Sequence, residues 1–217
     1  MNEICTGSFE AALQEQTLSG IHLADSPSDL ARILDPDVAM VLWHRAMPEH
    51  VHGWIDGLSR AVLPHIRAIV PVVRIPVIIA DALDLAGMPD CPERTFLIED
   101  IAELAARFAT LTEVAHVRLR LSAVETDSCR KFHVDAAKAR FICTYRGPGS
   151  QYGFSPDGSE PDEIFESDTG APMVLRGLAW REARASGLVH RSPPIEGTGQ
   201  TRLVLMLDPI EDPAADD

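Results

Sequence analysis

The second half of the chain is a series of short apolar segments separated by clusters of glycine, proline and serine. From Glu113 onward, Val117, Leu119 and Leu121 alternate with polar residues, which is the period of a strand buried on one face. Further short strands are predicted at 132–135, 139–145, 173–175, 188–190 and 202–207. Many short strands joined by turn residues are typical of a β-sandwich or a barrel, and this pattern restricts the fold more than any other feature of the sequence.

The first 114 residues are mixed and mainly helical. Apolar residues at helical spacing predict helices at 28–34, 51–58 and 98–108, while the apolar run 38–43 suits a buried strand. Residues 70–79 alternate prolines with β-branched residues, which predicts an edge strand or an extended segment. We therefore expect an α+β protein, in which a helical N-terminal region packs against a β core.

Three regions are expected along the chain. Residues 1–114 form the mainly helical region, residues 115–207 the β core, and residues 208–217 a frayed acidic tail. The segment 146–170 is rich in glycine, proline, serine and aspartate, and it is long for a loop in a compact domain. Loops of this length are often functional.

Charge and hydropathy exclude several partners. Nineteen Lys and Arg against 33 Asp and Glu give a net charge of -14, which disfavours binding to nucleic acid. No apolar run reaches the roughly 18 residues of a membrane span, and the N-terminus lacks a secretory signal, so we expect a cytoplasmic protein without a membrane partner. The four cysteines show no C-x-x-C pair, so buried thiols are expected rather than disulfides or a zinc ribbon.

A His-x-Asp pattern in the β core suggests a metal site. His133 and Asp135 lie two apart in a predicted strand, so both side chains point to the same face. Taken alone, such a pair is more often a surface or core-satisfied histidine beside a solvated aspartate than a pair of metal ligands. His190 ends another short strand and offers a second imidazole. Two imidazoles and one carboxylate, with the other positions open, form the facial triad of non-haem Fe(II) oxygenases, whereas a closed four-ligand site favours structural zinc.

An arginine follows the second histidine at the start of the last predicted strand. Arg202 comes twelve residues after His190 and opens the apolar run 203–207. A guanidinium inside a barrel needs an anionic partner, and the far carboxylate of 2-oxoglutarate would provide one.

The order His133, Asp135, His190 and Arg202 resembles the double-stranded β-helix of cupins and Fe(II)/2-oxoglutarate oxygenases. The resemblance covers residues 115–207 and implies a jelly-roll core. The stretch Arg140–Tyr145 resembles the strand after His-x-Asp in prolyl-hydroxylase-like members, in which a tyrosine can contact 2-oxoglutarate. It implies that Tyr145 assists Arg202 in binding the co-substrate, with Arg140 nearby.

Three further motifs resemble a bacterial domain-of-unknown-function family over most of the chain. They are Cys129–Asp135, Thr144–Gly149 and Val189–Pro194. Some members of that family are associated with metal-chaperone GTPases linked to zinc limitation. The resemblance implies metal binding and a link to such GTPases as partners, without specifying the metal.

The leading hypothesis is an Fe(II)/2-oxoglutarate-dependent dioxygenase, hydroxylase-like, acting on a small molecule or a protein side chain that the sequence does not identify. The alternative is a non-catalytic cupin-like protein of metal homeostasis, with zinc or manganese in the same triad and Arg202 paired with a carboxylate of the protein. A third reading is an interaction domain in which the His-x-Asp pattern is accidental.

Two other groups could bind ligands. His44, His50 and His52 form a local cluster, but His50 and His52 would lie about 200° apart if a helix starts at Pro48, and could not share an ion. Arg118 and Arg120 share one face of a strand, where they either meet an anion inside the barrel or form a solvated, salt-bridged face.

Overall fold

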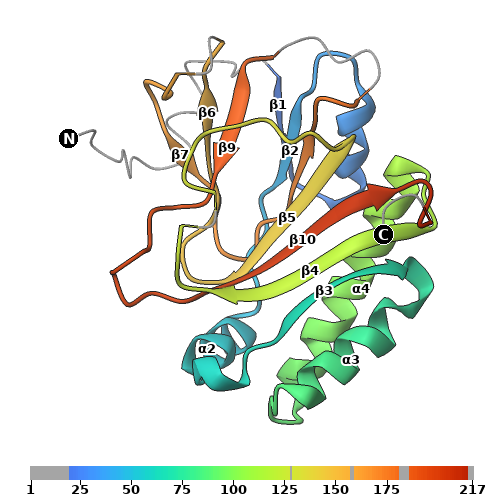
Figure 1. Cartoon of the computed structure of the whole chain (residues 1–217), viewed down its shortest axis with the longest axis vertical. Coiled ribbons are helices and arrows are strands. Elements are labelled where there is room, and N and C mark those ends of the chain that lie inside the picture. Colours follow the sequence, from blue (N-terminus) through green and yellow to red (C-terminus); the bar gives the residue numbers. More distant parts are fainter. Residues whose placement is uncertain (1–19, 128, 157–158, 181–185, 215–217) are drawn as a thin grey trace.

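The computed structural model describes residues 20–127, 129–156, 159–180 and 186–214. They form two β-sheets that face each other, with helices on the outer face of the larger sheet (Figure 1). All strand pairs are antiparallel except β1 and β2. The large sheet has the order β1 (Ile21–Ala24), β2 (Met40–Trp43), β8 (Met173–Arg176), β5 (Ala139–Arg146), β10 (Arg202–Ile210), β4 (His116–Val124) and β3 (His65–Pro71). The small sheet has the order β7 (Phe165–Glu166), β6 (Gln151–Phe154) and β9 (Leu188–Arg191).

The helices lie in the first half of the chain. They are α2 (Glu49–Gly57), α3 (Ile75–Leu85) and α4 (Pro92–Thr112), with short 3-10 segments η1 (Pro27–Leu34), η2 (Arg60–Val62) and η3 (Val72–Arg74). None of the helices described is long and apolar enough to cross a membrane.

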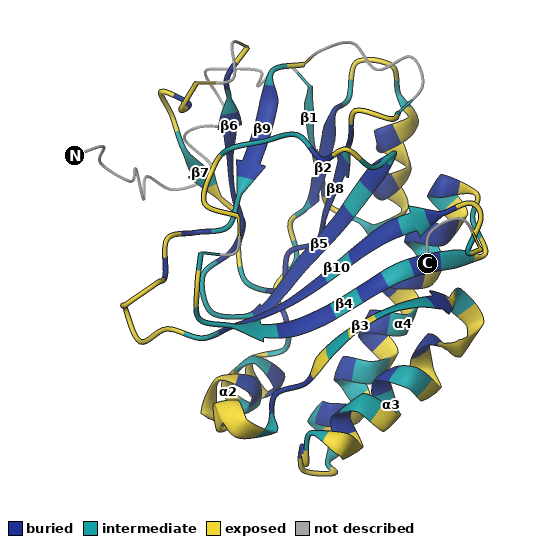
Figure 2. Ribbon diagram, in the orientation of Figure 1, coloured by how far each residue is buried: buried dark blue, intermediate teal, exposed yellow. Residues whose placement is uncertain are grey.

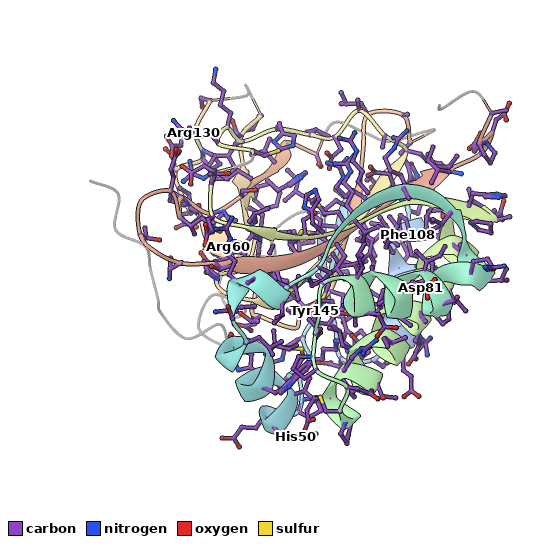
Figure 3. The ribbon with its side chains drawn as sticks, turned by 60° about the horizontal axis from the view of Figure 1, so that its bottom comes forward. His50, Arg60, Asp81, Phe108, Arg130 and Tyr145 are labelled. Carbon is purple, nitrogen blue, oxygen red and sulfur yellow. The ribbon has the colours of Figure 1, made fainter. Side chains whose placement is uncertain are left out.

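Alternation along β5 divides the core into two layers. Phe141, Cys143 and Tyr145 point to the helices, and the Phe108 ring of α4 packs on Phe141 with ring centroids 5.7 Å apart. Figure 3 shows Phe108 and Tyr145 on the helix side of the sheet. Ile142 points the other way and joins the apolar cluster between the two sheets. Side chains at even positions of β5 up to Thr144 therefore face the space in which the predicted site lies.

The predicted α+β class is confirmed, with a large mixed sheet and few helices. Strands occur at five of the predicted places, as β2, β4, β5, β8 and β9, and the last predicted strand is part of β10. The three predicted helices are η1, α2 and α4.

The prediction for residues 70–79 is wrong beyond Pro71. The strand β3 ends there, and the helix α3 begins at Ile75 with Pro76 in its first turn. Proline is tolerated at that position because the first N–H groups of a helix have no partner within it. The prolines of this segment therefore mark a strand end and a helix start.

Two more predictions need correction. The segment 146–170 is not one loop, since it contains β6 and β7. The acidic tail does not begin at Asp208, because β10 continues to Ile210 and Asp208 is 3% exposed.

Strands from both sides of the predicted boundary at 114/115 share one sheet, as β1, β2 and β3 lie beside β4, β5, β8 and β10. The division into domains stays a prediction.

Candidate metal centre

Three side chains converge between the two sheets. His190 belongs to β9, and His133 forms an isolated antiparallel bridge with it through two backbone hydrogen bonds of 3.0 Å. Asp135 follows two residues later and is 6% exposed. Each of the three offers one ligand atom, and these atoms lie within 4.8 Å of one another. The predicted strand at 132–135 is reduced to this bridge, which still aligns the two imidazoles.

The distances suit ligands of a single ion. Asp135 Oδ2 lies 3.2 Å from His190 Nε2, and Asp135 Oδ1 lies 3.7 Å from His133 Nε2. Two ligands at about 2.1 Å from one metal, at angles between 90° and 110°, would be about 3.0 to 3.4 Å apart. Small side-chain rotations would therefore bring these atoms into a common coordination sphere.

One atom of the group lacks a partner. Asp135 Oδ2 is buried and receives no hydrogen bond of suitable geometry, although His190 Nε2 lies 3.2 Å away and stabilises the charge of the carboxylate. A buried carboxylate oxygen without a donor is costly in a folded protein, unless a cation binds it. The free oxygen and the two imidazoles thus fit a divalent ion.

The other oxygen of Asp135 is held by an arginine. Arg140 Nη1 donates to Asp135 Oδ1, and its Nε donates to Asp208 Oδ1 at 2.7 Å. Burial alone would raise the pKa of Asp135, but the imidazoles of His133 and His190 and the charge of Arg140 outweigh it and hold this pKa well below its usual value. The carboxylate is therefore ionised and oriented before any cation binds.

The ring of His133 is also oriented. Its Nδ1 lies 2.9 Å from the backbone carbonyl oxygen of Lys131, and a proton on Nδ1 leaves Nε2 free as a ligand. The rings of His133 and His190 are close, with centroids 4.6 Å apart.

Arg202 is a buried cation that forms no hydrogen bond with a carboxylate of the described chain. It is 2% exposed, its Nε donates to the carbonyl oxygen of Pro148 at 2.7 Å, and its Nη2 donates to the hydroxyls of Thr144 and Ser150 at 3.1 and 3.3 Å. Burial lowers the pKa of Arg202 to about 10, and the charge of Glu166 only partly opposes this. Like Thr144, Arg202 faces the small sheet, so it can meet an anion between the sheets.

Tyr145, the second residue predicted to bind the co-substrate, lies elsewhere. Its hydroxyl donates to Asp100 Oδ2 at 2.6 Å, and its side chain is fully buried on the helix side of the sheet. The predicted contact with 2-oxoglutarate is not supported, because the sheet separates Tyr145 from the three converging residues. Arg140 lies at the site, where its contacts are with Asp135 and Asp208, and its role in binding the co-substrate stays a prediction.

Two residues beside the site were not predicted from the sequence. Tyr152 of β6 pairs with His190, is 2% exposed and belongs to the cluster between the sheets. Burial raises the pKa of its hydroxyl to about 12, so this group is a neutral donor. Asp208 was assigned to the tail, although the apolar run before it could have continued the strand. The alternation of side chains along β6 and β10 is the sequence pattern that could have indicated both residues.

The remaining candidates do not join the site. His50 and His52 lie on α2, and His52 is near Asp56, 3.4 Å away. His44 lies 3.8 Å from Asp168, and within the described ranges no group of three metal-binding side chains includes any of these histidines. Of the cysteines, Cys143 is buried, Cys91 is half-buried and Cys129 is exposed, while Cys5 lies outside the described residues.

Among solved structures, the chain is similar to dioxygenase for auxin oxidation 1 from Arabidopsis thaliana in its complex with 2-oxoglutarate. The two are 10% identical, the match covers 91% of this chain and 97% of that chain, and the TM-score is 0.52. The rice dioxygenase for auxin oxidation is 13% identical, over 87% and 79% of the two chains, with a TM-score of 0.48. An oxidoreductase of the 2OG-Fe(II) oxygenase family from Burkholderia pseudomallei is 14% identical, over 88% and 94%, with a TM-score of 0.42.

The first of these similarities establishes a shared fold, and the expected resemblance to Fe(II)/2-oxoglutarate oxygenases is confirmed at that level. By sequence, no protein of curated function matches the chain. Residues 24–208 match the family model described as protein of unknown function, DUF1826, which also confirms the expected resemblance to a domain-of-unknown-function family. The chain therefore belongs to the DUF1826 family.

Proposed function

We propose that the protein is a non-haem Fe(II)- and 2-oxoglutarate-dependent dioxygenase of the hydroxylase type, built on a cupin-like double-stranded β-helix. The observation that carries the proposal is the convergence of His133, Asp135 and His190, with Asp135 Oδ2 buried and without a hydrogen-bond donor. A carboxylate and two imidazoles are the donor set of the facial triad. The shared fold with a 2-oxoglutarate-binding dioxygenase supports the same reading.

Fe(II) held by these three side chains would supply the dioxygen activation that converts 2-oxoglutarate to succinate and carbon dioxide and puts the second oxygen atom into a substrate C–H bond. The protein contributes the geometry. Arg140 fixes Asp135 through Oδ1 and leaves Oδ2 for the ion, while the Lys131 carbonyl orients His133.

Arg202 would bind the carboxylate of 2-oxoglutarate that lies far from the metal. Its Nη1 has no hydrogen-bond partner within the described part of the chain, and the hydroxyls of Thr144 and Ser150 lie beside its Nη2. A carboxylate there would offset the charge of a guanidinium that burial leaves without a counter-ion. Tyr152 of β6 and His190 of β9 are cross-strand partners, so their side chains point to the same face of the small sheet. Tyr152 would therefore line the space between Arg202 and the triad.

The decisive experiment is anaerobic titration of the metal-free protein with Fe(II) and then 2-oxoglutarate. We expect a weak visible charge-transfer band from the chelate, and succinate formation when oxygen is admitted. His190→Ala should lose metal and band together. Arg202→Gln should keep the metal and need at least tenfold more 2-oxoglutarate to reach half of the band intensity.

His44→Ala is the matched control, because His44 is an exposed histidine outside the triad. It should behave as the unmodified protein. Tightly bound zinc with no chelate band, together with unchanged behaviour of Arg202→Gln, would overturn the dioxygenase proposal in favour of a metal-storage or sensing role. Unchanged metal content in His190→Ala would overturn metal binding by the triad.

A further inference from the structure

The face of the large sheet that holds Arg140 continues across β10 and β4 to β3. In Figure 2, no described helix or strand lies in front of β10, β4 and β3, whereas the small sheet covers the β2–β8–β5 side. Along this open face the strand register places Arg67 of β3 opposite Arg120 of β4, and Arg118 of β4 opposite Asp208 of β10. The charged face therefore begins at the metal centre and extends to the edge of the sheet.

Positive charge accumulates on this face in an acidic protein. Four of the nineteen basic residues of the chain, which carries a net charge of -14, lie on it: Arg67, Arg118, Arg120 and Arg140. Among the contacts described, two carboxylates compensate Arg120 and Arg140 in part, and Arg118 has an interaction of its own. Asp208 accepts hydrogen bonds from Arg120 and Arg140, and Asp135 accepts one from Arg140.

Arg67 and Arg120 keep side-chain donors that no described residue accepts. The Arg67 side chain is exposed, and no ion pair or side-chain hydrogen bond links it to another described residue. Arg120 Nε is buried and has no hydrogen-bond partner, while its Nη2 lies 3.1 Å from Asp208. Burial lowers the pKa of Arg120, and the charges of Arg140, Arg67 and Arg118 lower it further against the opposing effect of Asp208. Three neighbouring guanidinium groups therefore act on Arg120 against the single carboxylate of Asp208.

An anion would relieve the repulsion between Arg67 and Arg120, which lie opposite each other. Like charges directly opposite each other on antiparallel strands destabilise a sheet. An anion with two or three oxygens can bind two guanidinium groups in paired hydrogen bonds. Neighbouring strands are about 4.8 Å apart, so Arg67 on β3 lies about 10 Å from Met206, which faces it on β10. Asp208 is two residues further along β10, about 12 Å from Arg67, which is within the length of a small organic molecule.

We propose that the substrate carries a carboxylate or phosphate group that binds Arg67 and Arg120, and that this contact aligns the substrate with the triad. That the bound molecule is a substrate rests on the proposed function, whereas the anion site itself does not. Because Asp208 links Arg120 to Arg140, and Arg140 holds Asp135, the anion would be bound by the same hydrogen-bonded network that orients the metal ligand.

The test is isothermal titration calorimetry, in which the metal-free full-length protein is titrated with inorganic phosphate and, separately, with acetate. We expect saturable binding of at least one of these anions, and the tighter of the two identifies the anionic group of the substrate. Arg67→Gln and Arg120→Gln should weaken binding about tenfold or more, and Arg67→Lys should have an intermediate effect. Arg107→Gln is the control, since it removes the same charge from an exposed i,i+4 pair on α4, and it should bind within twofold of the unmodified protein.

A charge reversal separates ligand binding from folding. Arg67→Glu should abolish anion binding and yet raise Tm by about 1 to 3 °C, because it replaces a repulsive cross-strand pair with an attractive one. Failure of the unmodified protein to bind either anion, or unchanged binding in the Arg67 variants, would overturn the inference.

The anion site and the proposed function can fail separately. Arg67→Gln should still give the Fe(II)/2-oxoglutarate charge-transfer band, since Arg67 contacts no residue of the triad. If the band is absent from every protein while Arg67→Gln still loses anion binding, the dioxygenase proposal fails and the anion site stands. If the band forms and no anion binds, only the substrate inference fails.

Discussion

Arg140 links the large sheet to the candidate metal centre. It donates to Asp135 on one side and to Asp208 on the other, and its side chain is only 14% exposed. We predict that Arg140→Gln lowers the affinity for divalent metal by about 10- to 100-fold, because Asp135 loses the donor that fixes its orientation. Competition with a chromogenic chelator, using Zn²⁺ or Co²⁺, measures this.

Arg32→Gln provides the comparison, since Arg32 is an exposed arginine paired with Asp35. It should leave metal affinity unchanged. Equal affinities of the Arg140→Gln and unmodified proteins would show that Asp135 does not depend on Arg140.

The cysteines should differ strongly in reactivity. Cys143 is buried on the helix side of β5, and burial raises the pKa of its thiol to about 12, although the charge of Arg45 opposes the shift. At pH 8 this pKa leaves about one thiol in ten thousand ionised, and the thiolate is the reactive form. We predict that iodoacetamide alkylates exposed Cys129 and leaves Cys143 unmodified until the protein unfolds, as peptide mass spectrometry can determine. Equal labelling of both cysteines in the folded protein would contradict this placement.

The sequence predicted the triad better than the residues around it. His133, Asp135 and His190 could be found because the chemistry of His-x-Asp depends on a spacing of two, which even one short bridge preserves. Tyr145 was assigned to the same site as Arg140, although residues five apart in a regular strand point to opposite faces. A register shift opposite Leu203 and Val204 also breaks the alternation after Thr144. Sequence alone does not locate such a shift.

At the scale of elements, one buried polar cluster ties α4 to the large sheet. Asp100 of α4 accepts two hydrogen bonds from Arg45, at 2.5 and 2.7 Å, and one from the Tyr145 hydroxyl at 2.6 Å. Arg45 follows β2 and also donates to the carbonyl oxygen of Gly170 at 2.8 Å. The cluster therefore joins three segments that are distant in sequence.

Removal of the carboxylate should be costly. We predict that Asp100→Ala lowers the free energy of unfolding by about 3 to 5 kcal/mol, because it leaves the buried guanidinium of Arg45 without its counter-ion. Glu103→Ala, which breaks an exposed pair with Arg107 on the same helix, should cost about 0.5 kcal/mol or less. Urea denaturation followed by circular dichroism compares the two variants. A loss below 1 kcal/mol for Asp100→Ala would mean that solvent reaches Arg45 in the folded protein.

Elements with a strong apolar period were predictable, and those set by tertiary contacts were not. The helix α4 has apolar residues at helical spacing from Leu97 to Ala109, and β4 alternates from His116 to Ala123. In contrast, α3 was hidden by Pro71 and Pro76, whose effect depends on where an element begins or ends. The strand β7 has two residues, and its pairing with β6 cannot be read from such a short period.

At the scale of the whole molecule, the order of the strands in the sheets could not be predicted from the sequence. The N-terminal strands β1 and β2 extend the large sheet beside β8, and β3 forms its opposite edge, so the first half of the chain lies on both sides of the second. Local periodicity contains no information on which strands pair over such separations. The mainly helical character of residues 1–114 could be predicted from the sequence. The places of β1, β2 and β3 in the large sheet could not, because they depend on long-range pairing.

The metal centre should also stabilise the whole fold, because its ligands join the two sheets. His133 and His190 belong to the small-sheet side, while Asp135 is fixed to β5 and β10 through Arg140. A ligand that binds only the folded state at 100 times its Kd adds about 2.7 kcal/mol, and for a chain of this size that corresponds to a Tm increase of about 5 to 10 °C. We predict this increase for Mn²⁺ or Zn²⁺ in scanning calorimetry of the metal-free protein, and none for His190→Ala. The His44→Ala control should respond as the unmodified protein does. An equal shift in His190→Ala would place the stabilising metal elsewhere, since only binding at the triad requires that imidazole.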